Sequence, residues 1–310
     1  MANRIKEKYM AGKRYFDYPM LFLVIFLICF GLVMIYSTSS YKSTVTYGNS
    51  YHWLLRQAVA IVLGAVAMVV CCKLDYRIIK SEKFGNGCYW ASIVLLVLVL
   101  IIGAAKKGAV RWISIAGFQF QPSEVSKILV VIYLANRLSA NAHKIRTFKD
   151  SIVIVLPTVP IIALIVTQNL STALVVCSMI GVMLFVVSPK MKELMLTAGG
   201  GIILLFVYLL TANSYRNERV QIWLHPESHK KGFQTMQALY AIGSGGIFGK
   251  GLGQSMQKMG FIPESHNDMI FSIVCEETGI LGAFLTLFLF GILIWRLCML
   301  ALNCRDLKGT

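Results

Sequence analysis

Apolar residues along this chain are grouped in runs long enough to cross a membrane, and short polar segments separate the runs. An α-helix needs about 20 consecutive apolar residues to span the hydrocarbon core. The pattern therefore predicts an all-α polytopic membrane protein, with residues 1–310 as a single membrane domain. The runs predicted as eight transmembrane helices are 18–39, 53–72, 88–105, 121–138, 151–168, 169–188, 194–213 and 269–297.

Three places interrupt this pattern. Pro157 and Pro160 lie inside the fifth run and predict a kink there, because proline removes a helical hydrogen bond. The fifth and sixth runs meet near Asn169 with almost no loop between them. The segment 213–268, between the last two runs, is far longer than a simple connection needs. We interpret it as a long extracytoplasmic loop with a function of its own.

The composition agrees with a membrane protein and excludes an ordinary soluble one. Hydrophobic residues make up 57% of the chain and charged residues only 14%, whereas soluble domains have roughly 25% charged residues. The mean hydropathy is +0.68. The net charge of +16 would suggest nucleic acid in a soluble protein. Here 18 of the 30 Lys and Arg residues fall on one side of the predicted helices, and ten on the other. The positive-inside rule then places the N-terminus in the cytoplasm, and no nucleic-acid partner is expected.

The cysteines and histidines give weaker signals. All cysteines lie in or beside the predicted spans and form no C-x-x-C pair, so we interpret them as buried thiols rather than a disulfide framework or zinc site. His225 and His229 are four residues apart, but no third ligand is obvious, which disfavours zinc. The eight cysteines are Cys29, Cys71, Cys72, Cys88, Cys177, Cys275, Cys298 and Cys304.

The first polar feature is the segment 106–127, a basic loop that leads into the fourth predicted helix. Glu124 and Lys127 are three residues apart and therefore share one helix face. Charges at membrane depth are usually paired. The pair is either a structural ion pair or, together with Gln121 and Ser123, the polar wall of a cavity.

The second polar feature is the glycine-rich sequence GSGGIFGKGLGQ at 243–254. It is not a nucleotide-binding P-loop, because Lys250 is followed by Gly251 and not by Ser or Thr. The glycines permit close approach of the backbone to a bulky ligand, with amide groups turned toward anions. A flexible hinge is the alternative interpretation.

Three acids lie where this loop meets the last predicted helix. Asp268 stands at the boundary between water and membrane, where a carboxylate can act as a general base, hold a divalent cation, or cap the helix that follows. Glu276 and Glu277 lie deeper, and at least one should face the bundle interior. His266 belongs to the site or is simply a polar loop residue.

Four segments together resemble one family. They are QPSEVSK at 121–127, NLSTALV at 169–175, AIGSGGIFGKGLG at 241–253 and FIPESHNDMIFSIVCEETGILG at 261–282. In this order they are similar to the SEDS family of shape, elongation, division and sporulation proteins, with members FtsW, RodA and SpoVE. The similarity covers nearly the whole chain. The stretch before Asp268 is more similar to the division or sporulation branch, FtsW above all, than to RodA.

The resemblance implies a peptidoglycan glycosyltransferase that polymerises lipid II on the outer face of the cytoplasmic membrane during septal wall synthesis. It implies a class B penicillin-binding protein and other divisome proteins as partners. Asp268 corresponds to the family's catalytic aspartate, which would take the proton directly or beside a divalent cation (Mg²⁺ or Mn²⁺). Glu124, Lys127 and Trp112 correspond to other motif residues of the family. An apolar groove is expected to hold the polyprenyl tail. Residues expected to bind substrate are Trp112, Gln121, Ser123, Glu124, Lys127, Lys250 and His266; cations expected near the pyrophosphate are Lys127, Arg216, Arg219 and Lys250.

The chain also departs from the family pattern. Asn169 stands where the family usually has aspartate, and Met269 follows Asp268 in place of phenylalanine. The family has about ten spans and this chain has eight predicted spans, so the domain is expected to lack the last two at its C-terminal end. Alternative functions are a lipid II flippase, an elongation or sporulation polymerase, and a scaffold that recruits division proteins.

Overall fold

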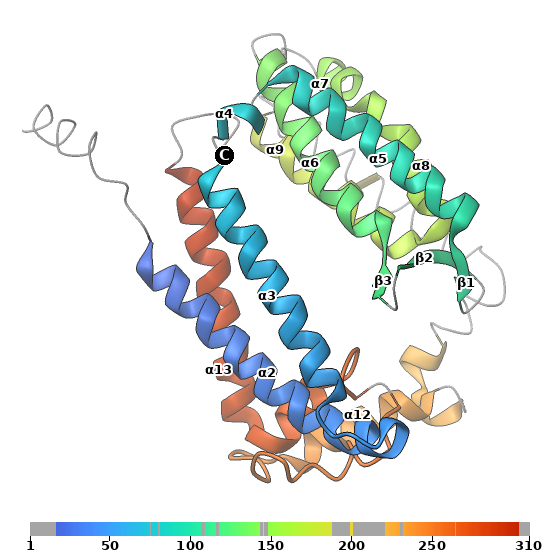
Figure 1. Ribbon diagram of the computed structural model, residues 1–310, viewed down its shortest axis with the longest axis vertical. Coiled ribbons are helices and arrows are strands. Elements are labelled where there is room, and N and C mark those ends of the chain that lie inside the picture. The colour runs from blue at the N-terminus through green and yellow to red at the C-terminus, as the bar shows by residue number, and fades with distance from the viewer. Residues whose placement is uncertain are drawn as a thin grey trace, which may run out of the picture. The chain divides into compact units, whose positions relative to one another are not determined.

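The computed structural model consists of helices, one small sheet and a long loop that carries a further helix (Figure 1). The residues it describes are 17–74, 76–79, 81–106, 109–115, 118–142, 145, 148–187, 199–200, 221–229, 232–263 and 265–303. The helices are α2 (Tyr18–Tyr47), α3 (His52–Lys73), α4 (Tyr76–Ile79), α5 (Glu82–Ile102), α6 (Pro122–Asn141), α7 (Phe148–Val155), α8 (Val159–Gln168), α9 (Leu170–Val187), α12 (Phe233–Ser244) and α13 (Ile270–Leu302). Short 3₁₀ turns are η2 (Leu156–Thr158) and η3 (Pro226–Ser228), and the strands are β1 (Ala104–Lys106), β2 (Ala109–Ile115) and β3 (Phe118–Phe120).

Six helical segments in the described part of the chain are long and apolar enough to cross a membrane. They are Tyr18–Tyr47, His52–Lys73, Glu82–Ile102, Lys149–Gln168, Leu170–Val187 and Ile270–Leu302. The fourth predicted span is the 20-residue helix α6, which carries Glu124, Lys127 and Arg137 and is not among these six. The seventh, 194–213, lies outside the described residues except for 199–200. The protein is therefore a multi-pass membrane protein built from helices.

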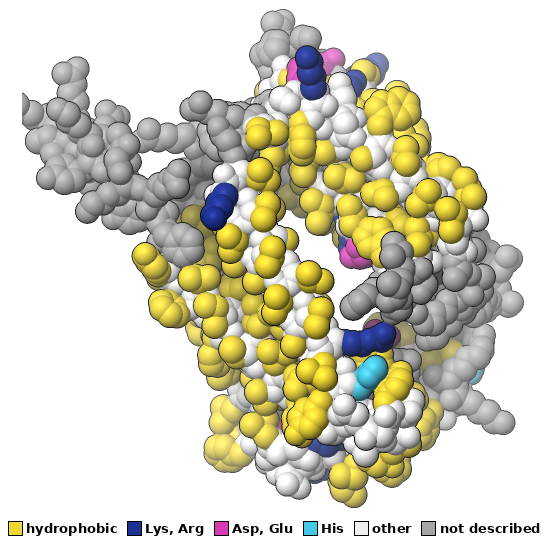
Figure 2. Space-filling view, viewed as in Figure 1, with side chains coloured by type: hydrophobic (Ala, Val, Ile, Leu, Met, Phe, Trp, Pro, Cys, Tyr) yellow, Lys and Arg dark blue, Asp and Glu magenta, His cyan; other side chains and the backbone are white. Residues whose placement is uncertain are grey.

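The exposed surfaces of these helices are apolar, as a lipid environment requires. Every residue of α3 is at least partly exposed, although most of its side chains are hydrophobic. Figure 2 shows hydrophobic side chains along the exposed faces of the helices. Cys88 and Cys275 are buried, as predicted. The prediction of buried thiols is wrong for five cysteines, which lie on helix faces that no described neighbour covers: Cys29, Cys71, Cys72, Cys177 and Cys298.

The chain divides into two compact units, each described by itself below. The first contains Met1–Val69 and Asn213–Cys304, and the second contains Val70–Ala212 and Arg305–Thr310. In the first unit α2 packs against α13, and α12 packs against α13 as well. In the first unit, α2 and the loop helix α12 therefore both lie against α13.

Capping residues define the ends of α2. The Asp17 side chain accepts a hydrogen bond from the Met20 amide at 3.1 Å, which satisfies a free amide of the first turn. At the other end Gly48 adopts a left-handed conformation (φ 68°), and its amide donates to the Thr44 carbonyl. The 30 residues between these caps extend about 45 Å, well beyond the roughly 30 Å of a hydrocarbon core.

In the second unit, four helices enclose the apolar core. Leu96 of α5, Leu134 of α6 and Ile165 of α8 are fully buried there, and Val176 of α9 completes the contact. The predicted kink in the fifth span is confirmed, because the 3₁₀ turn η2, around Pro157, separates α7 from α8. The fifth span therefore bends at its two prolines, while its residues on both sides of the bend still belong to the apolar core.

A small antiparallel sheet precedes α6 in the segment predicted as a basic loop. Its strand order is β1-β2-β3, with Trp112 of β2 paired with Ala104 and Ile113 paired with Phe120. The sheet is the one β-structure in the described residues, and the membrane-crossing segments are all helical. The sequence did not indicate it, because its strands are short and alternate weakly.

Asn169 makes the abrupt turn between α8 and α9, in agreement with the predicted lack of a loop. Its side-chain oxygen accepts hydrogen bonds from the amides of Ser171 (3.1 Å) and Thr172 (3.4 Å), which is the N-cap arrangement. The side chain of the preceding residue, Gln168, is buried and donates to the Leu96 carbonyl at 3.2 Å.

We expect Asn169→Ala to lower the free energy of unfolding by about 1 kcal/mol, because the first turn of α9 loses its cap. Asn169→Asp should retain the stability, since aspartate caps equally well and its charge suits a helix N-terminus. Thermal denaturation of the purified protein in detergent measures both. Equal stabilities for the Ala and Asp variants would contradict the capping role.

Candidate functional site

Asp268 occupies the turn immediately before α13 and is exposed. It makes no hydrogen bond or ion pair with the described part of the chain. The prediction that Asp268 caps the helix is wrong: the N-cap residue is Met269, and no side chain caps this end. The Ser272 hydroxyl instead donates back to the Met269 carbonyl at 2.7 Å. The carboxylate of Asp268 is therefore open to a ligand.

α13 contains a break at Gly279, whose backbone angles (φ 69°, ψ −171°) are not helical. The first piece is Ile270–Thr278 and the second piece is Ile280–Leu302. A Cβ atom at Gly279 would lie 2.4 Å from both the Gly249 nitrogen and the Ile247 oxygen. Only glycine fits here, because the positive φ and the close backbone both exclude a side chain.

The glycine-rich loop runs along this break and pairs with it through the backbone. The amides of Lys250 and Gly251 donate to the carbonyls of Glu276 (2.9 Å) and Glu277 (3.0 Å). In return, the amide of Ile280 donates to Gly246 (3.0 Å), and that of Leu281 to Ile247 (3.2 Å). The predicted close approach of backbone is therefore real, but its partner is the chain's own helix. These bonds satisfy the groups that the break in α13 leaves free.

Glu276 is fully buried at this junction and is neutralised by the loop. Its carboxylate accepts a hydrogen bond from Lys250 Nζ at 2.7 Å and another from the Ser255 hydroxyl. The amide of Met256 donates to it at 3.3 Å. Lys250, predicted to bind substrate, thus has a partner within the protein, although its side chain is still 35% exposed.

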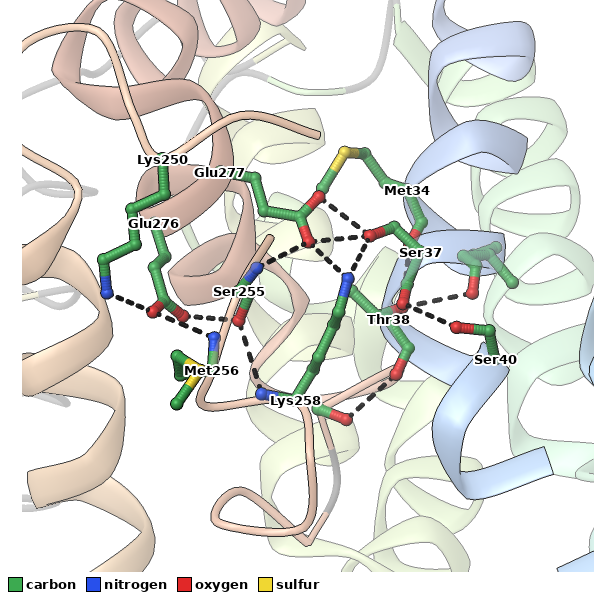
Figure 3. A network of polar contacts seen from close by, with 12 residues as sticks. Met34, Ser37, Thr38, Ser40, Lys250, Ser255, Met256, Lys258, Glu276 and Glu277 are labelled. Carbon is green, nitrogen blue, oxygen red and sulfur yellow. Dashed lines mark hydrogen bonds and ion pairs between the residues drawn. The ribbon is translucent and has the colours of Figure 1, made fainter. Parts of the chain in front are cut away.

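Glu277 is buried as well, on the opposite side of the loop (Figure 3). Lys258 Nζ lies 2.8 Å from Glu277 Oε1 and 2.9 Å from Ser37 Oγ of α2. The Ser37 hydroxyl donates to both carboxylate oxygens, at 2.7 and 2.8 Å. The amide of Ser255 is 3.4 Å from Oε1. The prediction that at least one of the two glutamates faces inward is confirmed for both.

Further contacts attach the rest of the loop to α2 and α3. Lys42 Nζ donates to the Pro263 carbonyl at 2.6 Å, and the Ser265 hydroxyl donates to the Thr38 carbonyl at 3.3 Å. His266 is buried against the Trp53 ring, with 4.8 Å between the ring centroids. His266 is therefore a packed residue two positions from the exposed Asp268.

Two grooves border this part of the first unit. One, of about 570 Å³, lies between α2 and the loop and is lined by residues that include Tyr36, Tyr41 and Lys258. The other, of about 280 Å³, lies among α2, α3 and α13, and its lining is apolar except for Gln57. The second groove has the character expected for a hydrocarbon chain.

The remaining predicted site residues lie in the second unit, at the start of α6. Lys127 Nζ is 2.8 Å from Glu124 Oε2, so the two side chains share a helix face, as their spacing predicts, and form an ion pair. Gln121 donates to the Ser123 hydroxyl at 2.9 Å, and Ser123 is buried. Trp112 is half-buried in β2. Arg216 and Arg219 lie outside the described residues.

Metal coordination has little support in the donor set. No group of three or more His, Cys, Asp or Glu side chains in the described ranges could hold a metal ion. His225 Nδ1 lies 3.4 Å from Glu227 Oε1. Asp268 offers one carboxylate, so a divalent cation there would depend on ligands from elsewhere, and its presence stays a prediction.

Sequence reasoning missed Lys258, Ser37 and Ser255. Lys258 and Glu277 are 19 residues apart, and Ser37 is 240 residues from Glu277. No local pattern links such positions, because the contact exists only once the loop has folded onto α2. The one available signal was the pair of acids in an apolar run, which requires partners of opposite charge.

Comparisons with known proteins agree with one another. A family model described as "Cell cycle protein", FtsW/RodA/SpoVE, matches residues 18–310. The chain is 35% identical to the probable peptidoglycan glycosyltransferase FtsW of Geobacter metallireducens, over 95% of this chain and 79% of that protein. It is 34% identical to the stage V sporulation protein E of Bacillus subtilis, over 95% of this chain and 81% of that one.

Solved structures give the same result. A chain from a structure described as "Structural coordination of polymerization and crosslinking by a peptidoglycan synthase complex" matches with a TM-score of 0.75 and 29% identity, over 96% of this chain and 81% of that chain. The rod shape determining protein RodA of Thermus thermophilus matches with a TM-score of 0.66 and 28% identity, over 95% and 78% of the two chains.

Proposed function

This chain belongs to the FtsW/RodA/SpoVE family of cell cycle proteins and is a peptidoglycan glycosyltransferase, and we propose that it polymerises lipid II with Asp268 as the general base. The observation that carries the assignment of Asp268 is its exposed carboxylate, which makes no hydrogen bond or ion pair with the described residues, although Ser255, Lys258 and Ser265 of the same loop are all bonded. A general base must be accessible to the proton that it removes.

The reaction follows from the chemistry of the substrate. The 4-hydroxyl of one disaccharide attacks the anomeric carbon of another, which carries undecaprenyl pyrophosphate. The new carbon–oxygen bond forms as the bond from the anomeric carbon to the pyrophosphate breaks, and the pyrophosphate leaves with the electron pair. Asp268 takes the hydroxyl proton. A positioned base of this kind contributes about 10²–10⁴-fold to the rate.

The leaving pyrophosphate requires positive charge or amide donors. We propose Lys127 and Lys250 for this role, with Trp112, Gln121, Ser123, Glu124 and His266 as further substrate-binding residues. A divalent cation, Mg²⁺ or Mn²⁺, would supply charge neutralisation for the pyrophosphate, with Asp268 as a ligand. The apolar groove among α2, α3 and α13 suits the polyprenyl tail.

Partners and location follow the same family relationship. One structural relative is a chain in a peptidoglycan synthase complex that combines polymerisation with crosslinking. We therefore propose a penicillin-binding protein of class B, which crosslinks strands, as the partner of this chain, together with other divisome proteins. The proposed location is the cytoplasmic membrane at the division septum, with the N-terminus in the cytoplasm, because several relatives carry the name FtsW and the basic segments favour that orientation.

The function is tested by incubating the detergent-purified protein with lipid II and separating the products by gel electrophoresis. We expect glycan chains, because detergent micelles have no two compartments and polymerisation does not need them. A flippase would form no polymer in this assay, and neither would a scaffold. Absence of chain growth with active partner protein added would contradict the proposed function.

A further inference from the structure

The segment 255–268, which we call the outer segment, ends at Asp268 and is held at several points. Ser255 contacts Glu276, and Lys258 contacts Glu277 and Ser37. Nearer Asp268, Ser265 and His266 are both buried. Asp268 and its neighbour Asn267 are thus exposed directly after a buried stretch.

In the described outer segment the side chain of Lys258 is buried, with only 5% of its surface exposed, whereas that of Asp268 is exposed. The ammonium group of Lys258 lies between α2 and α13, because Ser37 belongs to the first helix and Glu277 to the second (Figure 3). A buried carboxylate is stable only when its charge is compensated. Without Lys258, Glu277 would keep two neutral donors, the Ser37 hydroxyl and the Ser255 amide.

Lys258 borders the groove between α2 and the loop, but its side chain is only 5% exposed and its ammonium group is already engaged. Its nitrogen is within hydrogen-bond distance of two protein oxygens, and Glu277, its counter-ion, is 1% exposed. An ammonium group neutralised in this way offers little charge to a pyrophosphate. Its effect on the reaction must therefore pass through the position of the outer segment.

We propose that Lys258 is a positioning residue: through Glu277 and Ser37 it fixes the outer segment between α2 and α13, and so fixes the place of Asp268. The catalytic part of this inference rests on the proposed function. The structural part, that the outer segment is ordered by this buried ion pair, stands independently of it.

The test compares four variants: Lys258→Met, Lys258→Arg, the double variant Lys258→Met/Glu277→Gln, and the control Lys83→Met. Lys83 is an exposed lysine of α5 in the second unit, so the control removes the same charge from the surface. Two quantities are measured: kcat and KM for lipid II in detergent, and hydrogen–deuterium exchange of the amides of residues 255–268 without substrate.

For Lys258→Met we expect kcat to fall at least tenfold, KM to change less than threefold, and exchange in the outer segment to become faster. Lys258→Arg should keep kcat within about threefold of the unaltered chain, because it retains the charge. The double variant leaves no unpaired charge at this place. Its amides in the outer segment should therefore exchange more slowly than those of Lys258→Met, and its kcat should be at least threefold higher than that of Lys258→Met. Lys83→Met should match the unaltered chain.

The outcomes separate the two claims. If the unaltered chain makes no polymer, the proposed function fails, and exchange alone decides the inference. Unchanged exchange and kcat in Lys258→Met would overturn the inference. So would a raised KM with unchanged exchange, which indicates direct contact with substrate. If Lys258→Met cannot be purified, the double variant decides: the inference is wrong if its exchange equals that of the unaltered chain and its kcat still falls tenfold.

Discussion

Asp268→Asn is expected to reduce the rate of lipid II polymerisation by about 10²–10⁴-fold, because asparagine keeps the shape of the side chain but cannot accept the proton. The fold should be unaffected. Asp268 is exposed, makes no bond within the described chain and does not cap α13, and such surface substitutions usually change the free energy of unfolding by less than about 0.5 kcal/mol. Polymer formation by the purified variant and its thermal denaturation measure the two effects.

Glu227→Gln serves as the matched control, since it removes an exposed acid from η3 in the same unit. It should retain full polymerase activity. Asp268→Ala should be as inactive as Asp268→Asn, because alanine cannot accept the proton either. It should also be as stable, because Asp268 does not cap α13. Polymer made by Asp268→Asn at a rate near that of the unaltered chain would exclude Asp268 as the base.

Gly279→Ala should destabilise the protein on the order of 3 kcal/mol or prevent its purification. The positive φ at Gly279 strains any side chain, and the added Cβ would overlap the backbone of Ile247 and Gly249. The glycine-rich loop would have to leave the break in α13, which removes its four backbone hydrogen bonds. The melting temperature in detergent and the yield of folded protein measure the effect.

Gly291→Ala is the control in the same helix. Its Cβ would meet no atom within 4 Å, and alanine favours helix over glycine by about 1 kcal/mol, so stability should be equal or slightly higher. Similar melting temperatures for Gly279→Ala and Gly291→Ala would show that the break is not required for the fold.

The sequence predicted the helices because span length and proline chemistry are local properties. Seven of the eight apolar runs correspond to helices, and the seventh run, 194–213, lies outside the described residues except for 199–200. Pro157 lies in the 3₁₀ turn that divides the fifth span, and Asn169 forms the tight turn after it. The Glu124–Lys127 ion pair also follows from spacing, since residues three apart share a helix face. The helix α12 and the three-stranded sheet were not predicted, because both lie in segments without a strong apolar period.

The environment of the site depended on contacts that no local pattern contains. Asp268 was identified by its place at the start of the last span, yet its freedom from the helix cap became evident only in the structure. The glycines near Lys250 were expected to approach a ligand, and they approach the break at Gly279 instead. The network of Ser37, Lys258 and Glu277 joins parts of the chain separated by more than 200 residues.

The break in α13 also separates a piece long enough to cross the hydrocarbon core from a shorter piece next to Asp268. The 23 residues from Ile280 to Leu302 extend about 35 Å, which is enough to cross the hydrocarbon core without the first piece. The nine residues from Ile270 to Thr278 add about 13 Å, and Asp268 lies two residues before the start of this first piece. The length of the piece that can cross the hydrocarbon core is therefore independent of the piece that leads to Asp268.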